Sequence, residues 1–296
     1  MPIISENSGW NHPPALRPTG LFVTDLDGTL LRSDRTFAAA DLKALRRLGE
    51  CGVVRVLATG RSLFSFEKVR TPDLPLDYLV FSTGAGLAEL PSGRIVRAQS
   101  LDPAEVRCAC EVLRALGLDF MVQRPIPETH AFGFHASGRT NPDFDRRIAL
   151  YARFAFPLDG DAAGFGPATQ LVAILPPEGP PETLPEVRRL LPELTVIRTT
   201  SPLDHRSTWI EIFPASVSKS RTTGWLADRL GIPPARTASV GNDYNDLDLL
   251  DWSATCFVTA NAPPDLRQRY PVVATNDDCG MSQAAGLWLE KLRIDQ

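Results

Sequence analysis

The sequence predicts an α/β protein with a Rossmann-like parallel sheet as its core and an inserted α+β domain. Two observations lead to this prediction. Short apolar runs alternate with helical patterns at both ends of the chain, as in a parallel sheet whose strands are joined by helices. Between about residues 87 and 205, strand-like pieces, helices and many prolines replace that alternation. A length of 296 residues also suits two domains.

Three strand-like runs near the N-terminus end in small or polar residues. Residues 21–24 lead directly into the segment DLDGTL (25–30), and a helix over 38–49 connects them to a second run, 53–58. A third run, 79–82, ends in TGAG (83–86). Parallel strands place their carboxyl ends at one edge of the sheet, so we expect the ligand crevice there.

The change of pattern sets the predicted domain boundaries. We expect a loose N-terminal extension over 1–20, a core formed by 21–86 and 206–296, and the inserted domain over 87–205. The predicted elements of the insertion are strands 120–123, 132–135, 171–175 and 195–198 and helices 103–116, 141–151 and 185–191. The parallel pattern is expected to return with strand 209–213, helix 218–230 and strands 237–240, 256–260 and 272–274.

Composition excludes several classes of partner. With 31 basic and 35 acidic residues, the net charge of −4 offers no bulk attraction to nucleic acid or to an anionic membrane. The five cysteines are odd in number and scattered, which favours a reducing compartment. No apolar run approaches the roughly 20 residues that span a bilayer. We therefore expect a cytoplasmic protein that binds neither nucleic acid nor a membrane, and we take it to be a monomer or homodimer.

Two carboxylates, Asp25 and Asp27, follow the first strand. Asp25 can attack a phosphorus atom as a nucleophile, while Asp27 can protonate the leaving alcohol and later deprotonate the water that splits the aspartyl phosphate. An isolated Asp-x-Asp pair is explained about as well by an ordinary capped turn. The catalytic interpretation of this pair therefore depends on the motifs that follow it in the chain.

The second and third motifs supply groups for binding phosphate. In ATGR (58–61), the Thr59 hydroxyl and the backbone around Gly60 could hydrogen-bond phosphate oxygens, and Arg61 could reach the leaving group or form a structural salt bridge. Lys219, near the start of the helix 218–230, could offset repulsion between Asp25 and a dianionic phosphate. Alone, a lysine is more often a solvated surface residue.

The fourth motif, GNDYND (241–246), gathers hard oxygen ligands after the strand 237–240. Mg²⁺ prefers octahedral oxygen coordination by one or two carboxylates together with phosphate and water. Asn245 is a candidate substrate contact. The candidate metal ligands are Asp25, Asp27, Asn242, Asp243 and Asp246.

In this order DLDGTL, ATGR, Lys219 and GNDYND resemble the four motifs of the haloacid dehalogenase (HAD) superfamily of phosphatases. The insertion between the second and third motifs is similar to the type IIB cap of Cof-like and sucrose-phosphatase-like members, whose usual substrates are sugar phosphates and related phosphomonoesters. The resemblance implies a HAD fold, Mg²⁺ and an aspartyl-phosphate intermediate. It makes Asp25 the nucleophile, Asp27 the acid and base, Thr59 the phosphate binder and Lys219 the charge neutraliser.

The fourth motif departs from the pattern of that superfamily. Such enzymes commonly read Gly-Asp-x-x-Asn-Asp, whereas this chain has Asn242 in place of the first Asp and an acid one position later, at Asp243. Asn242 could still offer its side-chain oxygen, or Asp243 could replace it, and Asp246 could orient Lys219 or a metal-bound water. A neutral ligand should weaken the binding of Mg²⁺.

The expected activity is Mg²⁺-dependent hydrolysis of a small phosphomonoester, foremost a sugar phosphate. A phosphomutase of the phosphomannomutase type is a second enzymatic reading, and a non-catalytic sensor of a phosphorylated metabolite is a third, suggested by Asn242. Specificity should reside in the insertion, where the candidate contacts are Gln123, Arg124, His130 and His135.

Overall fold

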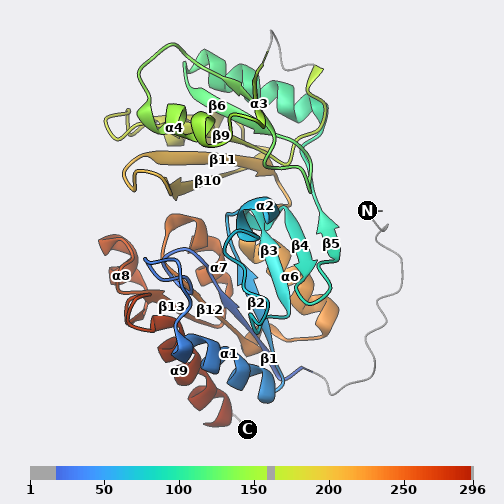
Figure 1. Cartoon of the computed structure of the whole chain (residues 1–296), viewed down its shortest axis with the longest axis vertical. Coiled ribbons are helices and arrows are strands. Elements are labelled where there is room, and N and C mark those ends of the chain that lie inside the picture. Colours follow the sequence, from blue (N-terminus) through green and yellow to red (C-terminus); the bar gives the residue numbers. More distant parts are fainter. Residues whose placement is uncertain (1–17, 159–163, 295–296) are drawn as a thin grey trace. The chain divides into compact units, whose positions relative to one another are not determined.

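The structure, a computed structural model, describes residues 18–158 and 164–294 (Figure 1). Residues 1–17 of the predicted extension lie outside the described residues. The chain divides into two compact units. The first takes its described residues from Met1–Gly60, Val69–Ala98 and Lys219–Gln296, and the second from Arg61–Lys68 and Gln99–Ser218. A parallel sheet core and a separate α+β unit confirm the predicted fold class.

The first unit is built on an eight-stranded sheet in the order β14-β13-β12-β1-β2-β3-β4-β5. The six strands from β14 to β3 are parallel, and β4 and β5 continue the sheet antiparallel. In chain order the strands are β1 (Gly20–Thr24), β2 (Val53–Ala58), β3 (Tyr78–Phe81), β4 (Gly86–Glu89), β5 (Ile95–Ala98), β12 (Thr237–Gly241), β13 (Thr255–Thr259) and β14 (Val272–Val273).

Helices cover both faces of this sheet, because alternate side chains of its buried strands point to opposite sides. On one face Phe22 of β1 meets Trp288 of α9, with ring centroids 5.7 Å apart. On the other, Leu21 and Val23 pack with Leu226 of α6. The helices of the unit are α1 (Ala39–Glu50), α6 (Lys219–Leu230), α7 (Leu247–Trp252), α8 (Pro264–Arg269) and α9 (Gly280–Ile294). Figure 1 shows α1 and α9 side by side.

The second unit contains a six-stranded sheet in the order β10-β11-β9-β6-β7-β8. All neighbours pair antiparallel except β7 and β8. Its helices α3 and α5 pack on one face of the sheet and α4 on the other. The elements are α2 (Leu63–Phe66), α3 (Pro103–Ala115), β6 (Asp119–Gln123), β7 (Phe132–His135), α4 (Pro142–Leu150), β8 (Ala155–Pro157), β9 (Gln170–Leu175), α5 (Thr183–Leu190), β10 (Leu194–Thr200) and β11 (Thr208–Pro214).

One predicted strand belongs to a different sheet from the one expected. Residues 209–213 were expected to resume the parallel core, but β11 lies in the second sheet, antiparallel to β10 and β9. That prediction is wrong because a short, almost wholly buried apolar run looks the same in either kind of sheet. The first unit also extends through β5 to Ala98, and its third part begins at Lys219, compared with the expected boundaries at 86 and 206.

No described helix combines the length and the apolar character that crossing a membrane would need.

Candidate active site

Polar residues follow three neighbouring parallel strands of the first sheet. Asp25 follows β1, Thr59 follows β2 and Asn242 follows β12. Because β12, β1 and β2 are parallel neighbours, their carboxyl ends meet at one edge. Backbone bonds tie the segments together: the Asp25 N–H donates to the Val240 carbonyl at 2.9 Å, and the Thr83 N–H donates to the Thr59 carbonyl at 3.0 Å. The first, second and fourth motifs thus converge.

The third motif joins the same cluster. The Lys219 Nζ atom donates to Asp25 Oδ1 at 2.7 Å and to Asp246 Oδ1 at 2.6 Å. The side chains of Lys219 and Asp246 are fully buried, and that of Asp25 is 7% exposed. Asp27 is exposed. The two aspartates of the first motif therefore occupy different environments, one desolvated beside a cation and one open to solvent.

Burial governs the electrostatics of this cluster. Desolvation raises the pKa of Asp25 to about 7, against the attraction of Lys219, and the nearby Asp246 adds to the increase. Burial alone would lower the pKa of Lys219, but the negative charges of Asp246 and Asp25 outweigh it and raise that pKa. Lys219 thus remains an ammonium, and its positive charge lies where a dianionic group approaching Asp25 would need it.

Asp246 and Asp243 hold the turn that follows β12. The second oxygen of Asp246, Oδ2, accepts the backbone N–H of Asn242 at 2.9 Å and that of Asp243 at 3.1 Å. The Asp243 carboxylate in turn caps the 3₁₀ turn Tyr244–Asp246 by accepting the backbone N–H of Asp246. Asp243 and Asp246, two of the predicted metal ligands, are therefore engaged in fixing this turn.

Asn242 lies against the first motif. One atom of its side-chain amide, placed as Oδ1, lies 3.3 Å from Asp25 Oδ2 and 2.9 Å from the Asp27 carbonyl oxygen. The Thr29 hydroxyl donates to the same atom at 3.1 Å. Turning the amide over brings its nitrogen to this point, within hydrogen-bonding distance of all three oxygens, and the turned orientation satisfies both ends of the amide.

The same atoms fit a hard divalent cation. Two oxygens bound to Mg²⁺ at about 2.1 Å and at right angles lie about 3.0 Å apart, close to the spacings around Asn242. A carboxylate of Asp25, the carbonyl of Asp27 and the amide oxygen of Asn242 would form a largely neutral donor set. Within residues 18–158 and 164–294, no three Asp, Glu, His or Cys side chains gather as a metal-binding group.

Gly28 allows the close approach between these two motifs. Its φ is +77°, and a Cβ atom at this position would lie 2.5 Å from the Asn242 side-chain amide. The Gly28 carbonyl accepts the Asn261 amide at 2.8 Å and the Thr259 hydroxyl at 3.3 Å. Sequence reasoning missed Asn261, which follows β13 and carries no motif of its own.

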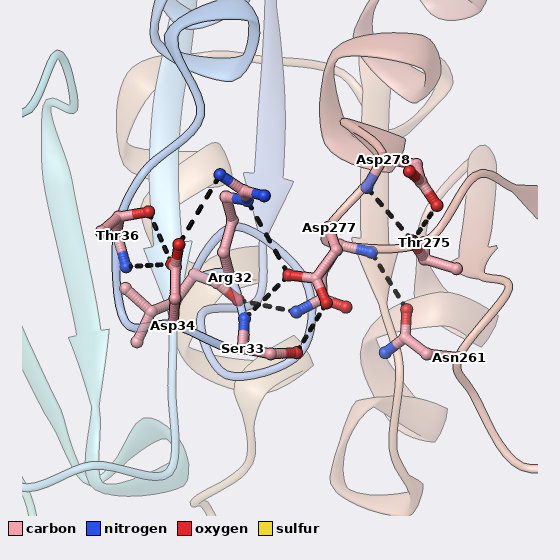
Figure 2. A network of polar contacts seen from close by, with 10 residues as sticks. Arg32, Ser33, Asp34, Thr36, Asn261, Thr275, Asp277 and Asp278 are labelled. Atoms are coloured by element: carbon pink, nitrogen blue, oxygen red, sulfur yellow. Dashed lines mark hydrogen bonds and ion pairs between the residues drawn. The ribbon is translucent and has the colours of Figure 1, made fainter.

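A polar network extends from Asn261 to the loop beyond the first motif (Figure 2). The Asn276 N–H donates to the Asn261 side chain at 3.1 Å, and the Asn276 amide donates to the Leu31 carbonyl at 3.0 Å. Asp277 accepts both the backbone N–H and the hydroxyl of Ser33, at 2.9 and 2.8 Å. These bonds connect the loop that follows the first motif to the turn before α9.

The phosphate-binding candidates of the second and fourth motifs also lie together. A Cβ atom at Gly60 would be 3.5 Å from both the Asn245 amide and the Thr83 hydroxyl. Ser82 and Thr83 have φ angles of +47° and +54°, a left-handed conformation that is rare for residues other than glycine. Sequence reasoning noted this segment only as small and polar. Non-glycine residues held in this conformation cluster at functional sites.

The remaining candidates belong to the second unit and are described there alone. Arg61 donates to the Ser65 carbonyl at 3.2 Å. His130 stacks on Phe64 with ring centroids 4.3 Å apart, and burial lowers its pKa. Gln123 pairs with Gln170 across β6 and β9, and both are buried.

A half-buried arginine on the same side of that sheet was not foreseen. The guanidinium of Arg147 lies 4.0 Å from the ring centroid of Tyr151 and 5.5 Å from that of Trp209. Its Nε atom is buried without a hydrogen-bond partner, as is Oε1 of Gln170. The sequence could have marked Arg147 as a candidate, because it lies three residues after Phe144 and so on the apolar side of α4.

Comparison with known proteins gives a consistent result. The model of the haloacid dehalogenase-like hydrolases matches residues 22–284. The 5-amino-6-(5-phospho-D-ribitylamino)uracil phosphatase YwtE of Bacillus subtilis is 22% identical over 274 residues, which are 87% of this chain and 94% of the relative. An HMP-PP phosphatase of Cronobacter sakazakii is 24% identical over 278 residues, 92% of this chain and 96% of the relative.

Solved structures share the fold. BT1666, a HAD phosphatase of Bacteroides thetaiotaomicron, superimposes with a TM-score of 0.73 at 19% identity, covering 95% of this chain and 99% of that one. The HAD subclass IIB sugar phosphatase BT4131 gives a TM-score of 0.71 at 17% identity, covering 91% of this chain and 98% of that one.

Proposed function

Since the chain belongs to the haloacid dehalogenase-like hydrolase family and is a phosphatase of that superfamily, we propose that it hydrolyses a small phosphomonoester through a phosphorylated Asp25. The observation that supports this assignment is the position of Lys219. Its ammonium lies between Asp25 and Asp246, at 2.7 and 2.6 Å, at the strand ends where the other motifs meet.

The proposed reaction has two steps at one phosphorus atom. An Asp25 carboxylate oxygen forms a bond to phosphorus while the bond from phosphorus to the leaving oxygen breaks, and Asp27 gives that oxygen a proton. Water then attacks the phosphorus of the aspartyl phosphate and passes a proton to Asp27. The phosphorus–Asp25 bond breaks, which releases inorganic phosphate and restores both acids.

The other residues bind and orient the phosphoryl group. Lys219 offsets the negative charge that the phosphate brings to Asp25, and we assign to Thr59 and the backbone at Gly60 the donation of hydrogen bonds to the phosphate oxygens. HAD superfamily phosphatases generally use Mg²⁺, which would be held here by Asp25, the Asp27 carbonyl and Asn242 and would neutralise charge on the phosphate. Asp246 keeps Lys219 and the Asn242 turn in place.

The substrate class follows from the second unit, to which we assign specificity. Arg147 and Gln170 offer buried polar atoms without partners on the α4 side of its sheet, and Gln123 and Glu211 are buried on that same side. The unpartnered atoms of Arg147 and Gln170 suit the hydroxyls of a sugar-like metabolite, because an unsatisfied buried polar group discriminates strongly for a ligand that satisfies it. Sugar phosphatase BT4131 shares the fold.

A phosphate-release assay on a panel of sugar phosphates, with and without millimolar Mg²⁺, tests the proposal. The native chain should release inorganic phosphate, Asp25→Asn should release none, and acid-quenched native enzyme should carry one labile phosphoryl group. Gln170→Leu should raise KM for sugar phosphates and leave turnover of p-nitrophenyl phosphate unchanged. Isomerised sugar phosphate in place of free phosphate would indicate a mutase, and binding without turnover would indicate a sensor.

A further inference from the structure

We propose that Asn242 substitutes reversibly for the metal ion: in the metal-free protein its amide nitrogen binds the oxygens of Asp25 and Asp27 that a cation would bind, and the amide turns over when the cation enters. This inference rests on the proposed function, which places a divalent cation at these oxygens. It goes further by giving the neutral residue a role that a carboxylate at the same position could not perform.

The contacts around Asn242 require a positive centre. The inward atom of its amide faces Asp25 Oδ2 at 3.3 Å and the Asp27 carbonyl at 2.9 Å, both of which can only accept a hydrogen bond when Asp25 is ionised. When the inward atom is oxygen it accepts the Thr29 hydroxyl at 3.1 Å, but its contacts with Asp25 and Asp27 remain oxygen against oxygen. Such contacts are repulsive unless a proton donor or a cation lies between the two oxygens. With the nitrogen inward, the amide supplies the donor itself.

The surroundings of the outward atom of the amide also favour the nitrogen-inward orientation. In the orientation with oxygen inward, the outward nitrogen faces only donors, so both ends of the amide are mismatched. Turning the amide corrects both ends at once. In the metal-free protein the nitrogen-inward orientation is therefore favoured by several hydrogen bonds, one of them to a carboxylate and thus charge-assisted.

Cation binding reverses this preference at a cost. The cation needs an oxygen at the inward position, so the amide must rotate about its terminal torsion and place its nitrogen against the outward donors. A carboxylate at position 242 would present an oxygen on each side and would need no such rotation. Asn242 thus stabilises the metal-free site and weakens the cation-bound one, whereas aspartate would do the reverse.

The matched pair for the test is Asn242→Asp and Gln268→Glu. Both replace an amide by a carboxylate of the same shape, and Gln268 is exposed on α8, outside the site. In EDTA we expect Asn242→Asp to melt lower than the native chain, by on the order of 5 °C, because the new carboxylate faces the oxygens of Asp25 and Asp27 with no N–H between them. Gln268→Glu should have the same melting temperature as the native chain.

Mg²⁺ titration by calorimetry supplies the second readout. Asn242→Asp should bind Mg²⁺ with a dissociation constant lower by about tenfold or more, since ligand charge increases and no amide has to turn. Saturating Mg²⁺ should then reverse the order of melting temperatures. Gln268→Glu should keep the native dissociation constant. An unchanged affinity in Asn242→Asp, or a metal-free melting temperature equal to the native one, would overturn the inference.

Nuclear magnetic resonance on the native chain keeps the test independent of variant folding. The side-chain NH₂ signals of Asn242, identified by their absence from Asn242→Asp or by selective labelling, should be protected from exchange in EDTA and should shift when Mg²⁺ is added. Signals that stay the same at saturating Mg²⁺ would reject the turning amide. None of these measurements uses turnover, so a chain that released no phosphate would refute the proposed function and leave this result standing.

Discussion

Asp246 binds the Lys219 ammonium with one carboxylate oxygen, at 2.6 Å, and the backbone of the Asn242 turn with the other. The positive charge beside Asp25 and the turn that carries the proposed metal ligand therefore depend on a single fully buried side chain. An amide cannot replace it, because an amide has only one accepting oxygen and both ends of Asp246 accept.

Asp246→Asn should accordingly lose one of these two sets of bonds. We expect a loss of about 3 kcal/mol in the free energy of unfolding, typical of a broken buried ion pair, and a fall in kcat of roughly a hundredfold from a misplaced Lys219. Urea denaturation and steady-state phosphate release measure the two effects. Asp248→Asn is the control, because Asp248 accepts only the Ser220 N–H among the bonds described, at 3.0 Å. Equal behaviour of the two variants would refute the role of Asp246.

Gly28→Ala separates backbone strain from a side-chain collision. Gly28 and Gly138 both have positive φ, +77° and +82°, but a Cβ atom would meet the Asn242 amide at 2.5 Å only in the first case, and nothing within 4 Å in the second. Gly138→Ala should cost about 1 kcal/mol, the price of the conformation alone. Gly28→Ala should cost more and should also weaken Mg²⁺ binding by displacing Asn242. Thermal melting and calorimetry compare them, and identical losses would show that the contact is unimportant.

The motifs could be predicted from sequence because each is a local pattern. An apolar run that breaks into DLDGTL (25–30) or GNDYND (241–246) shows both the strand and its functional end, and parallel topology then brings these ends together without further information. The wrong sheet for 209–213 has the opposite cause: the pattern of one strand does not specify its neighbours.

The supporting residues could not be predicted because their partners are distant in the chain. Asn261 and Asn276 act on Gly28 and Leu31, more than two hundred residues earlier, and no pattern around either one marks it. The orientation of Asp243 into a cap and of Asn242 toward Asp25 depends on the turn after β12, which is fixed by Asp246. Spacing alone left both as candidate ligands.

Ser82 combines two unfavourable features, and its substitution should stabilise the protein. Its hydroxyl is buried without a hydrogen-bond partner, and its φ is +47°. Ser82→Ala removes the hydroxyl alone, and Ser82→Gly also relieves the backbone, so we expect the free energy of unfolding to rise from native to Ala to Gly, by about 1 kcal/mol at each step. Chemical denaturation ranks the three. If the native chain is the most stable, Ser82 has a favourable interaction that outweighs both costs.

Asp41 should give the folded protein a distinct pH dependence. It lies in the first turn of α1, fully buried, where Oδ1 accepts the Ser282 N–H at 2.9 Å and Oδ2 has no partner. Burial raises its pKa above the ordinary 3.8, so the folded chain holds this proton more tightly than the unfolded chain does. Its contribution to stability is therefore largest below pH 3.8 and is lost as the pH rises through the folded-state pKa.

Asp41→Asn keeps the acceptor and cannot ionise, so its free energy of unfolding relative to native should increase from pH 4 to pH 7, measured by urea denaturation. A difference that stays constant or shrinks over this range would mean that the Asp41 carboxylate is stabilised in the folded state rather than penalised.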